Sequence, residues 1–153
     1  EGSCNVKNLY AKKEKNNKSN NSNLDLDNKL VFKDCKLSPN YDPGTTITLD
    51  LSKKVIKITE PGGTSEYYDV KTVYGDLIVS SNIKFATGIS DNDLNEIKNI
   101  IAMELKLDTD IKTVSITWDL LNGSGKMYDF FKKQFESGKK ARHVSSKCKL
   151  ENL

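Results

Sequence analysis

TTITLDLSKKVIKIT, residues 45–59, is the stretch that most clearly indicates the fold. Its apolar residues Ile47, Leu49 and Leu51 alternate with polar ones, as in a strand with one buried face. A three-residue connection, SKK, then leads into a second apolar run, VIKIT. The pattern predicts a β-hairpin.

Similar short runs, separated by turn residues, lie on both sides of this hairpin. The loop SPNYDPGT, just before it, carries two prolines and a glycine. The other predicted strands are LVFKDCKL (30–37), EYYDVKTVY (66–74), DLIVS (76–80), IKFAT (83–87), KTVSITWDL (112–120) and ARHVSSKCKL (141–150). We therefore expect a mainly β fold, an antiparallel meander of about eight strands that forms an open barrel or a covered sheet.

One segment, SDNDLNEIKNIIAMELKL (90–107), has a helical pattern instead. Ser90 is a suitable N-cap, acidic residues follow in the first turn, and apolar residues recur at helical spacing. We predict one amphipathic helix near 91–105. The segment also resembles the start of a calcium-binding loop, but Glu96 stands where that loop needs glycine and Ala102 where it needs glutamate.

The segment KMYDFFKKQF (126–135) fits either a helix or a strand, since its apolar residues suit both periodicities. We predict a strand, because LNGSGK (121–126) has the composition of a hairpin turn and ESGKK (136–140) can turn the chain back. GSGK is not a phosphate-binding loop, since Leu120 replaces its first glycine and Met127 its final hydroxyl residue.

Composition divides the chain into two parts. Residues 1–29 are rich in asparagine and lysine and lack apolar periodicity, so we expect a disordered tail or tether. We expect residues 30–150 to form a single β-rich domain, because this length is enough for one core.

Positive charge is concentrated near the C-terminus, where residues 122–153 carry eight basic residues against three acidic ones. Lys139, Lys140 and Arg142 are therefore candidates for binding an anion or a partner. The alternative is that these side chains simply face water, as lysine-rich strand faces commonly do.

The three cysteines, Cys4, Cys35 and Cys148, lack the C-x-x-C spacing of zinc or redox motifs. Two of them stand in similar pentads, KDCKL and SKCKL, in the first and last predicted strands. We predict a Cys35–Cys148 disulfide and with it a secreted, periplasmic or cell-envelope protein; two reduced, buried cysteines are the alternative. Cys4 is a candidate for lipid attachment or for an intermolecular link.

Little in the sequence points to catalysis. His143 is the only histidine, and we expect it to be solvated on a basic strand. Without a histidine–acid–nucleophile set or a metal motif, an enzyme that acts on an anionic polymer ranks last among our interpretations, and we expect no cofactor and no metal site. No apolar run reaches the roughly 18 residues of a transmembrane helix, although a membrane tether is left open. We expect nucleic acid not to be the partner, since secretion argues against it.

Residues 30–150 resemble small, uncharacterised secreted bacterial proteins rich in β-structure, with a cysteine in the first strand and another in the last. The likeness rests on VFKDCKL, ITLDLSKKVIKI, and LLNGSGKMYDFF running into SSKCKL. It implies a location and an architecture, and it assigns no catalytic or binding residue. We expect a non-enzymatic domain that binds a protein or an anionic surface through a sheet face or edge. A carrier of small apolar ligands or lipids, with a pocket inside the barrel, is the alternative.

Overall fold

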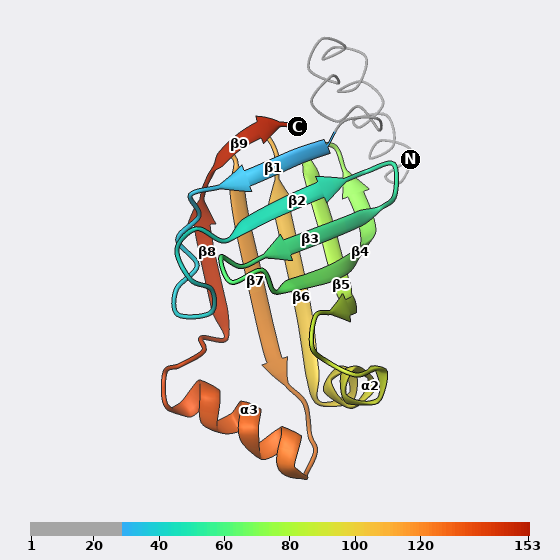
Figure 1. The fold of residues 1–153 in the computed structure, drawn as a ribbon, viewed down its shortest axis with the longest axis vertical. Coiled ribbons are helices and arrows are strands. Elements are labelled where there is room, and N and C mark those ends of the chain that lie inside the picture. Colours follow the sequence, from blue (N-terminus) through green and yellow to red (C-terminus); the bar gives the residue numbers. More distant parts are fainter. Residues whose placement is uncertain (1–28) are drawn as a thin grey trace, which may run out of the picture.

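The computed structural model describes residues 29–153 (Figure 1). Within this range the strands are β1 (Lys29–Lys33), β2 (Thr46–Asp50), β3 (Val55–Thr59), β4 (Ser65–Tyr74), β5 (Leu77–Ala86), β6 (Ile101–Asp108), β7 (Thr113–Leu120), β8 (His143–Lys147) and β9 (Lys149–Asn152). Helix α2 (Asp91–Ile100) connects β5 to β6, and helix α3 (Lys126–Glu136) connects β7 to β8. Cys4 and all but the last residue of the predicted tail lie outside the described residues.

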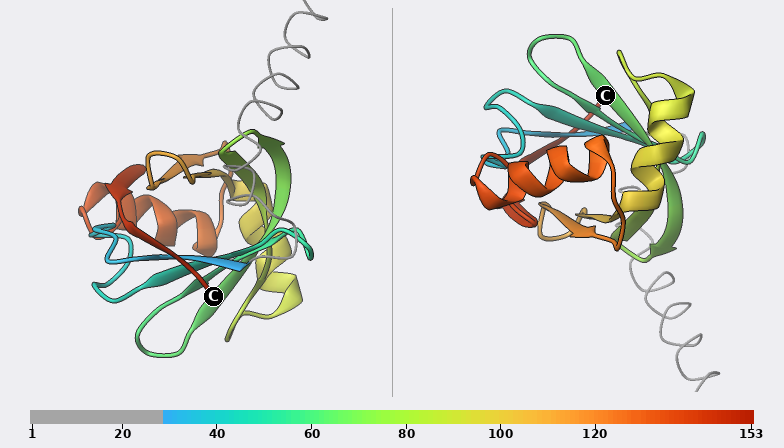
Figure 2. Two further views of the ribbon diagram at one scale, coloured as in Figure 1. Left: turned by 90° about the horizontal axis from the view of Figure 1, so that it is seen from above. Right: turned by 90° about the horizontal axis from the view of Figure 1, so that it is seen from below.

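The strands form one antiparallel sheet that curls into a nearly closed barrel, as the two end-on views in Figure 2 show. From β1 to β8, each strand pairs with the next along the chain. After Cys148 the chain continues as β9, which crosses to the other end of the sheet and pairs with β1. The predicted antiparallel meander is therefore confirmed, in its barrel form.

The apolar side chains of the alternating pattern that predicted the strands point into the barrel and fill it. Ile47 and Leu49 of β2 and Ile56 and Ile58 of β3 are at most 1% exposed, whereas the residues between them face outward. Further side chains in the same core are Phe32, Ile78, Leu105, Leu107, Val114 and Ile116. Apolar side chains therefore fill the interior of the barrel.

Helix α2 begins where predicted but ends earlier. The Ser90 side chain accepts a hydrogen bond from the Asp93 amide at 3.2 Å and so caps the first turn. The helix ends at Ile100, and residues 101–105, which we predicted to be helical, belong to β6. Ile101 and Leu105 are four residues apart, a spacing that suits both a helix and a strand. Pairing with β7 along the whole of β6 decides in favour of the strand.

The prediction of a strand at 126–135 is wrong, because these residues form α3. The preceding LNGSGK is not a hairpin turn but the loop into this helix, with Gly125 at the N-cap in a left-handed conformation (φ 112°). Met127, Phe131 and Phe135 are spaced by four residues, so they share one side of the helix but would also have shared one face of a strand, and the spacing could not decide between the two. Figure 2 shows α2 and α3 side by side across the lower end of the barrel.

The predicted disulfide joins Cys35, two residues after β1, to Cys148, between β8 and β9. Both cysteines are buried. The bridge therefore ties the end of the first strand to the point where the chain leaves one sheet edge for the other. Nearby, the Cys148 amide donates to the Lys112 carbonyl at 2.8 Å, and the Lys33 ammonium lies 2.7 Å from the Glu151 carboxylate.

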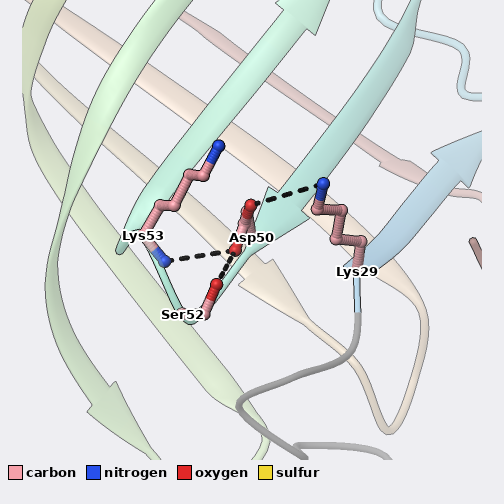
Figure 3. A network of polar contacts seen from close by, with 4 residues as sticks. All are labelled: Lys29, Asp50, Ser52 and Lys53. Atoms are coloured by element: carbon pink, nitrogen blue, oxygen red, sulfur yellow. Dashed lines mark hydrogen bonds and ion pairs between the residues drawn. The ribbon is translucent and has the colours of Figure 1, made fainter.

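An aspartate holds the turn of the β2–β3 hairpin (Figure 3). One carboxylate oxygen of Asp50 accepts hydrogen bonds from the Ser52 hydroxyl at 2.7 Å and from the Lys53 amide at 3.1 Å. The Lys29 ammonium lies 3.9 Å from the other oxygen. The hydrogen bond from Ser52 is the largest cause that lowers the pKa of Asp50 below its ordinary value.

We predict that Cys35→Ser/Cys148→Ser lowers the free energy of unfolding by about 4–5 kcal/mol, because the bridge closes a loop over a sequence separation of 113 and so restricts the unfolded chain. Denaturant unfolding of the oxidised protein and of the double variant measures this difference. A loss below about 1 kcal/mol would mean that strand pairing alone keeps the barrel closed.

We predict that Asp50→Ala lowers the free energy of unfolding at neutral pH by about 1–3 kcal/mol, because Ser52 and Lys53 lose their acceptor. Asp50→Asn, the matched control, keeps an acceptor oxygen and should lose less. A carboxyl whose pKa is lowered on folding stabilises above its unfolded pKa, and this contribution is lost as the pH falls through the folded pKa. The difference between wild type and Asp50→Asn in urea unfolding should therefore shrink below pH 3.8. A difference that grows there would contradict the assignment.

Candidate functional site

Aromatic and basic side chains gather on the outer face of β3, β4 and β5. Lys57 on β3 pairs with Tyr67 on β4, which pairs in turn with Phe85 on β5, so the three form a row across the strands. They point away from the barrel because the neighbouring Ile56, Ile58 and Tyr68 point into it. We call this surface the outer-face platform, and it consists of Val55, Lys57, Tyr67, Lys84 and Phe85.

A β-bulge explains why Lys84 and Phe85 share the outer face. Tyr67 pairs with Phe85 and Tyr68 with Ile83, so Lys84 is an extra residue without a partner on β4. An extra residue in one strand re-aims the side chains around it. Strict alternation would have placed Ile83 and Phe85 on the same face, but Ile83 packs against the core while Phe85 is 45% exposed. The sequence pattern does not predict the platform, since a bulge leaves no clear signal in the period-two alternation.

The platform surrounds an open depression of about 370 Å³, lined by Val55, Tyr67, Lys84 and Phe85. The rings of Tyr67 and Phe85 have centroids 5.6 Å apart and planes inclined by 50°. The Lys57 ammonium lies 5.5 Å from the centroid of the Tyr67 ring, within range of a cation–π interaction. The depression therefore offers two ring surfaces for stacking, with charged groups beside them.

Polar side chains border the platform. Lys84 lies 3.5 Å from the Asp69 carboxylate, which supplies hydrogen-bond acceptors next to the ammonium donor. Thr59 and Ser65 face each other on β3 and β4, with their hydroxyl oxygens 3.4 Å apart. Asn82, opposite Asp69 on β5, adds an exposed amide. The surface thus combines aromatic stacking with donors and acceptors at its margin.

The basic residues predicted to bind an anion or a partner lie between α3 and β8. Lys139 is exposed, and the Arg142 guanidinium packs 5.0 Å from the Phe135 ring. Lys140 is engaged within the protein, because its ammonium donates to the Asn40 carbonyl at 2.9 Å and lies within 6.0 Å of two aromatic rings. Lys140 therefore fixes the loop after β1, while anion binding by this group stays a prediction.

His143 is exposed at the start of β8, where its Nδ1 lies 2.8 Å from the Thr117 hydroxyl oxygen. Among residues 29–153, no three histidine, cysteine, aspartate or glutamate side chains are grouped as metal ligands would be. Neither helix in this range is long and apolar enough to cross a bilayer.

Inside the barrel, β4 carries a buried polar cluster. One carboxylate oxygen of Glu66 accepts hydrogen bonds from the Tyr41 hydroxyl at 2.6 Å and from the Tyr68 hydroxyl at 2.8 Å. Both tyrosines are buried, and burial is the largest cause that raises the pKa of each hydroxyl well above its ordinary value. The cluster ties the loop that carries Tyr41 to β4, directly behind the platform.

No protein-family model matches this chain, and no significant match was found among curated proteins or solved structures. A function must therefore be inferred from the molecule's own geometry. The outer-face platform combines a depression with two aromatic rings, the exposed Phe85 and the half-buried Tyr67. Such a combination is typical of ligand-binding surfaces.

We predict that Tyr41 and Tyr68 ionise only when the protein unfolds in alkali. Because their pKa values are raised on folding, they stabilise the protein below their unfolded pKa, near 10.0, and this contribution is lost as the pH rises through the folded values. The phenolate absorbance of folded wild type and folded Tyr68→Phe should then be equal at high pH, with wild type absorbing more only after unfolding. A lower absorbance in the folded variant would show that Tyr68 ionises in the native protein.

Proposed function

We propose that the protein is a non-enzymatic binding domain of the extracytoplasmic space and that the outer-face platform holds its ligand. The Cys35–Cys148 disulfide is compatible with an oxidising compartment. The observation that carries the proposal is the pair of half-buried Tyr67 and exposed Phe85 around an open depression, with Lys57 and Lys84 beside it. Phe85 lies next to the last residue of β5, is 45% exposed and is not part of the core, and its ring lines the depression.

The chemistry of the platform favours a carbohydrate chain as the ligand. Sugar rings present C–H bonds that pack on aromatic faces, and hydroxyls at their edges that exchange hydrogen bonds with polar side chains. The 5.6 Å between the ring centroids of Tyr67 and Phe85 is close to the length of one sugar residue in an extended β-linked chain. Lys84 and Asp69 stand where they can bind the hydroxyls. The 50° between the ring planes favours a single twisted chain over a flat crystalline surface.

The sheet face is favoured over the sheet edge as the binding surface. The loop after β1 runs along β8, where the Lys36 amide donates to the Ser146 hydroxyl at 2.7 Å. Just before β8, the Ala141 amide donates to the Asn40 side chain at 2.7 Å. These contacts cover the open side of β8, so a partner strand would have to displace them.

The outer face is also favoured over the barrel interior, the site required by a carrier of apolar ligands. Ile47, Leu49, Leu105, Leu107 and Val114 are fully buried and fill that space, and a ligand there would have to displace them. The depression lined by Tyr67 and Phe85 lies on the opposite side of β4 and is open to solvent.

We predict that a soluble β-linked oligosaccharide binds to the platform, with cellohexaose, chitohexaose and peptidoglycan fragments as probes in isothermal titration calorimetry. Phe85→Ala and Tyr67→Ala should each weaken binding by about tenfold or more, because each removes one stacking surface. Phe130→Ala, which removes a similarly exposed phenylalanine from α3, is the matched control and should leave the affinity unchanged.

The carbohydrate proposal fails if the wild type binds none of these probes, or if Phe85→Ala and Phe130→Ala bind equally well. Tighter binding of an oligothymidylate, lost in Phe85→Ala, would identify the platform as a nucleic-acid surface instead. Binding of an apolar dye to the native monomer, unchanged by Phe85→Ala, would support the interior carrier.

A further inference from the structure

Helix α3 is amphipathic, yet none of its residues is buried. Met127, Phe131 and Phe135 on its apolar side are half-buried, and the helix lies at the lower end of the barrel (Figure 1). Phe135 lies there with its ring centroid 6.4 Å from that of Trp118. The helix therefore covers the barrel end without contributing a buried side chain to the core.

A second feature of α3 is a stripe that faces solvent. Lys126, Phe130 and Lys133 are spaced by four and three residues, so they lie along one side of the helix. Phe130 is 54% exposed, and both lysines are exposed as well. The Phe130 ring lies in an edge-to-face arrangement with the neighbouring Phe131 ring, with 5.4 Å between the ring centroids. Phe130 thus presents an apolar surface between two positive charges.

Positive charge extends beyond the stripe. From residue 126 to residue 142 the chain holds six basic residues against two acidic ones. Lys132, Lys139 and Arg142 are exposed within this segment, as are the acidic Asp129 and Glu136, so the segment as a whole carries a net positive charge. A partner that complements this surface must be anionic and must also accept an apolar ring.

We propose that α3 docks the protein on an anionic lipid surface. Phe130 enters the headgroup region, while Lys126 and Lys133 keep their ammonium groups at the lipid phosphates and carboxylates, as amphipathic side chains do at membrane interfaces. A soluble polyanion matches the charge but gives no reason for the exposed ring. The docking surface lies at the lower end of the barrel, on a different element from the platform strands β3–β5 (Figure 1), so it goes beyond the proposed carbohydrate site.

The test is co-sedimentation of the protein with vesicles of phosphatidylcholine mixed with phosphatidylserine, and with vesicles of phosphatidylcholine alone. The wild type should bind the mixed vesicles and not the neutral ones. Lys126→Gln/Lys133→Gln should bind about 25-fold more weakly, because each lysine near an anionic membrane contributes about 1 kcal/mol, a factor of about five. Lys54→Gln/Lys71→Gln, which neutralises two exposed lysines away from α3, should bind like the wild type.

The role of the ring is tested by Phe130→Ala, which should weaken binding to the mixed vesicles by about fivefold. Phe85→Ala, which truncates an exposed phenylalanine on the platform, is its control and should have no effect. Circular dichroism should show that every variant keeps the native fold, since all these positions are exposed.

Absence of vesicle binding by the wild type would overturn the proposal. So would a pattern in which the lysine variant loses affinity for both vesicles and heparin while Phe130→Ala loses neither, because that pattern identifies a soluble polyanion as the partner. Carbohydrate binding by the platform does not enter these measurements, so each proposal can fail without the other.

Discussion

One segment of chain, running from β8 through Cys148 into β9, supplies partners to both edges of the sheet, and the rest of the structure depends on this closure. Without it, β1 and β7 would each present a row of unpaired backbone groups. β9 is only four residues long and pairs with β1 from Leu30 to Lys33. So short a strand holds its place because the disulfide fixes the chain immediately before it to the end of β1.

Closure of the barrel also gives the side chains of a strand two environments, the buried interior and the solvent-facing outer surface. On β4, Glu66 and Tyr68 point into the barrel and join the buried cluster with Tyr41, whereas Tyr67 between them points outward to the platform. The inner set fixes the backbone of β4 from behind. The outer set can therefore hold two aromatic rings at a fixed separation, which a ligand needs if it is to bind without ordering the surface first.

The sequence predicted the elements in which local pattern and tertiary structure agree. Alternation matches burial throughout β3 and from Thr46 to Leu49 in β2, with the buried Asp50 as the exception, and the Ser90 cap marks the start of α2. The prediction from sequence failed at Ile101 and Leu105, because a spacing of four residues suits both a helix and a strand. It also failed in α3, where a glycine-rich loop resembled a hairpin turn. The platform could not be predicted, because the bulge at Lys84 arises from the pairing of β4 with β5 and not from either strand alone.

Phe85 and Phe130 raise the question of why exposed apolar side chains are present at all. A single exposed phenylalanine is common and needs no explanation, so exposure alone carries little weight. Each of these two, however, lies beside lysines: Lys84 lines the same depression as Phe85, and Lys126 and Lys133 flank Phe130 along the helix. Neither ring contributes to the buried core, which is complete without them. We therefore expect polar residues at both positions to leave the core intact, and we propose that each ring serves a contact outside the protein.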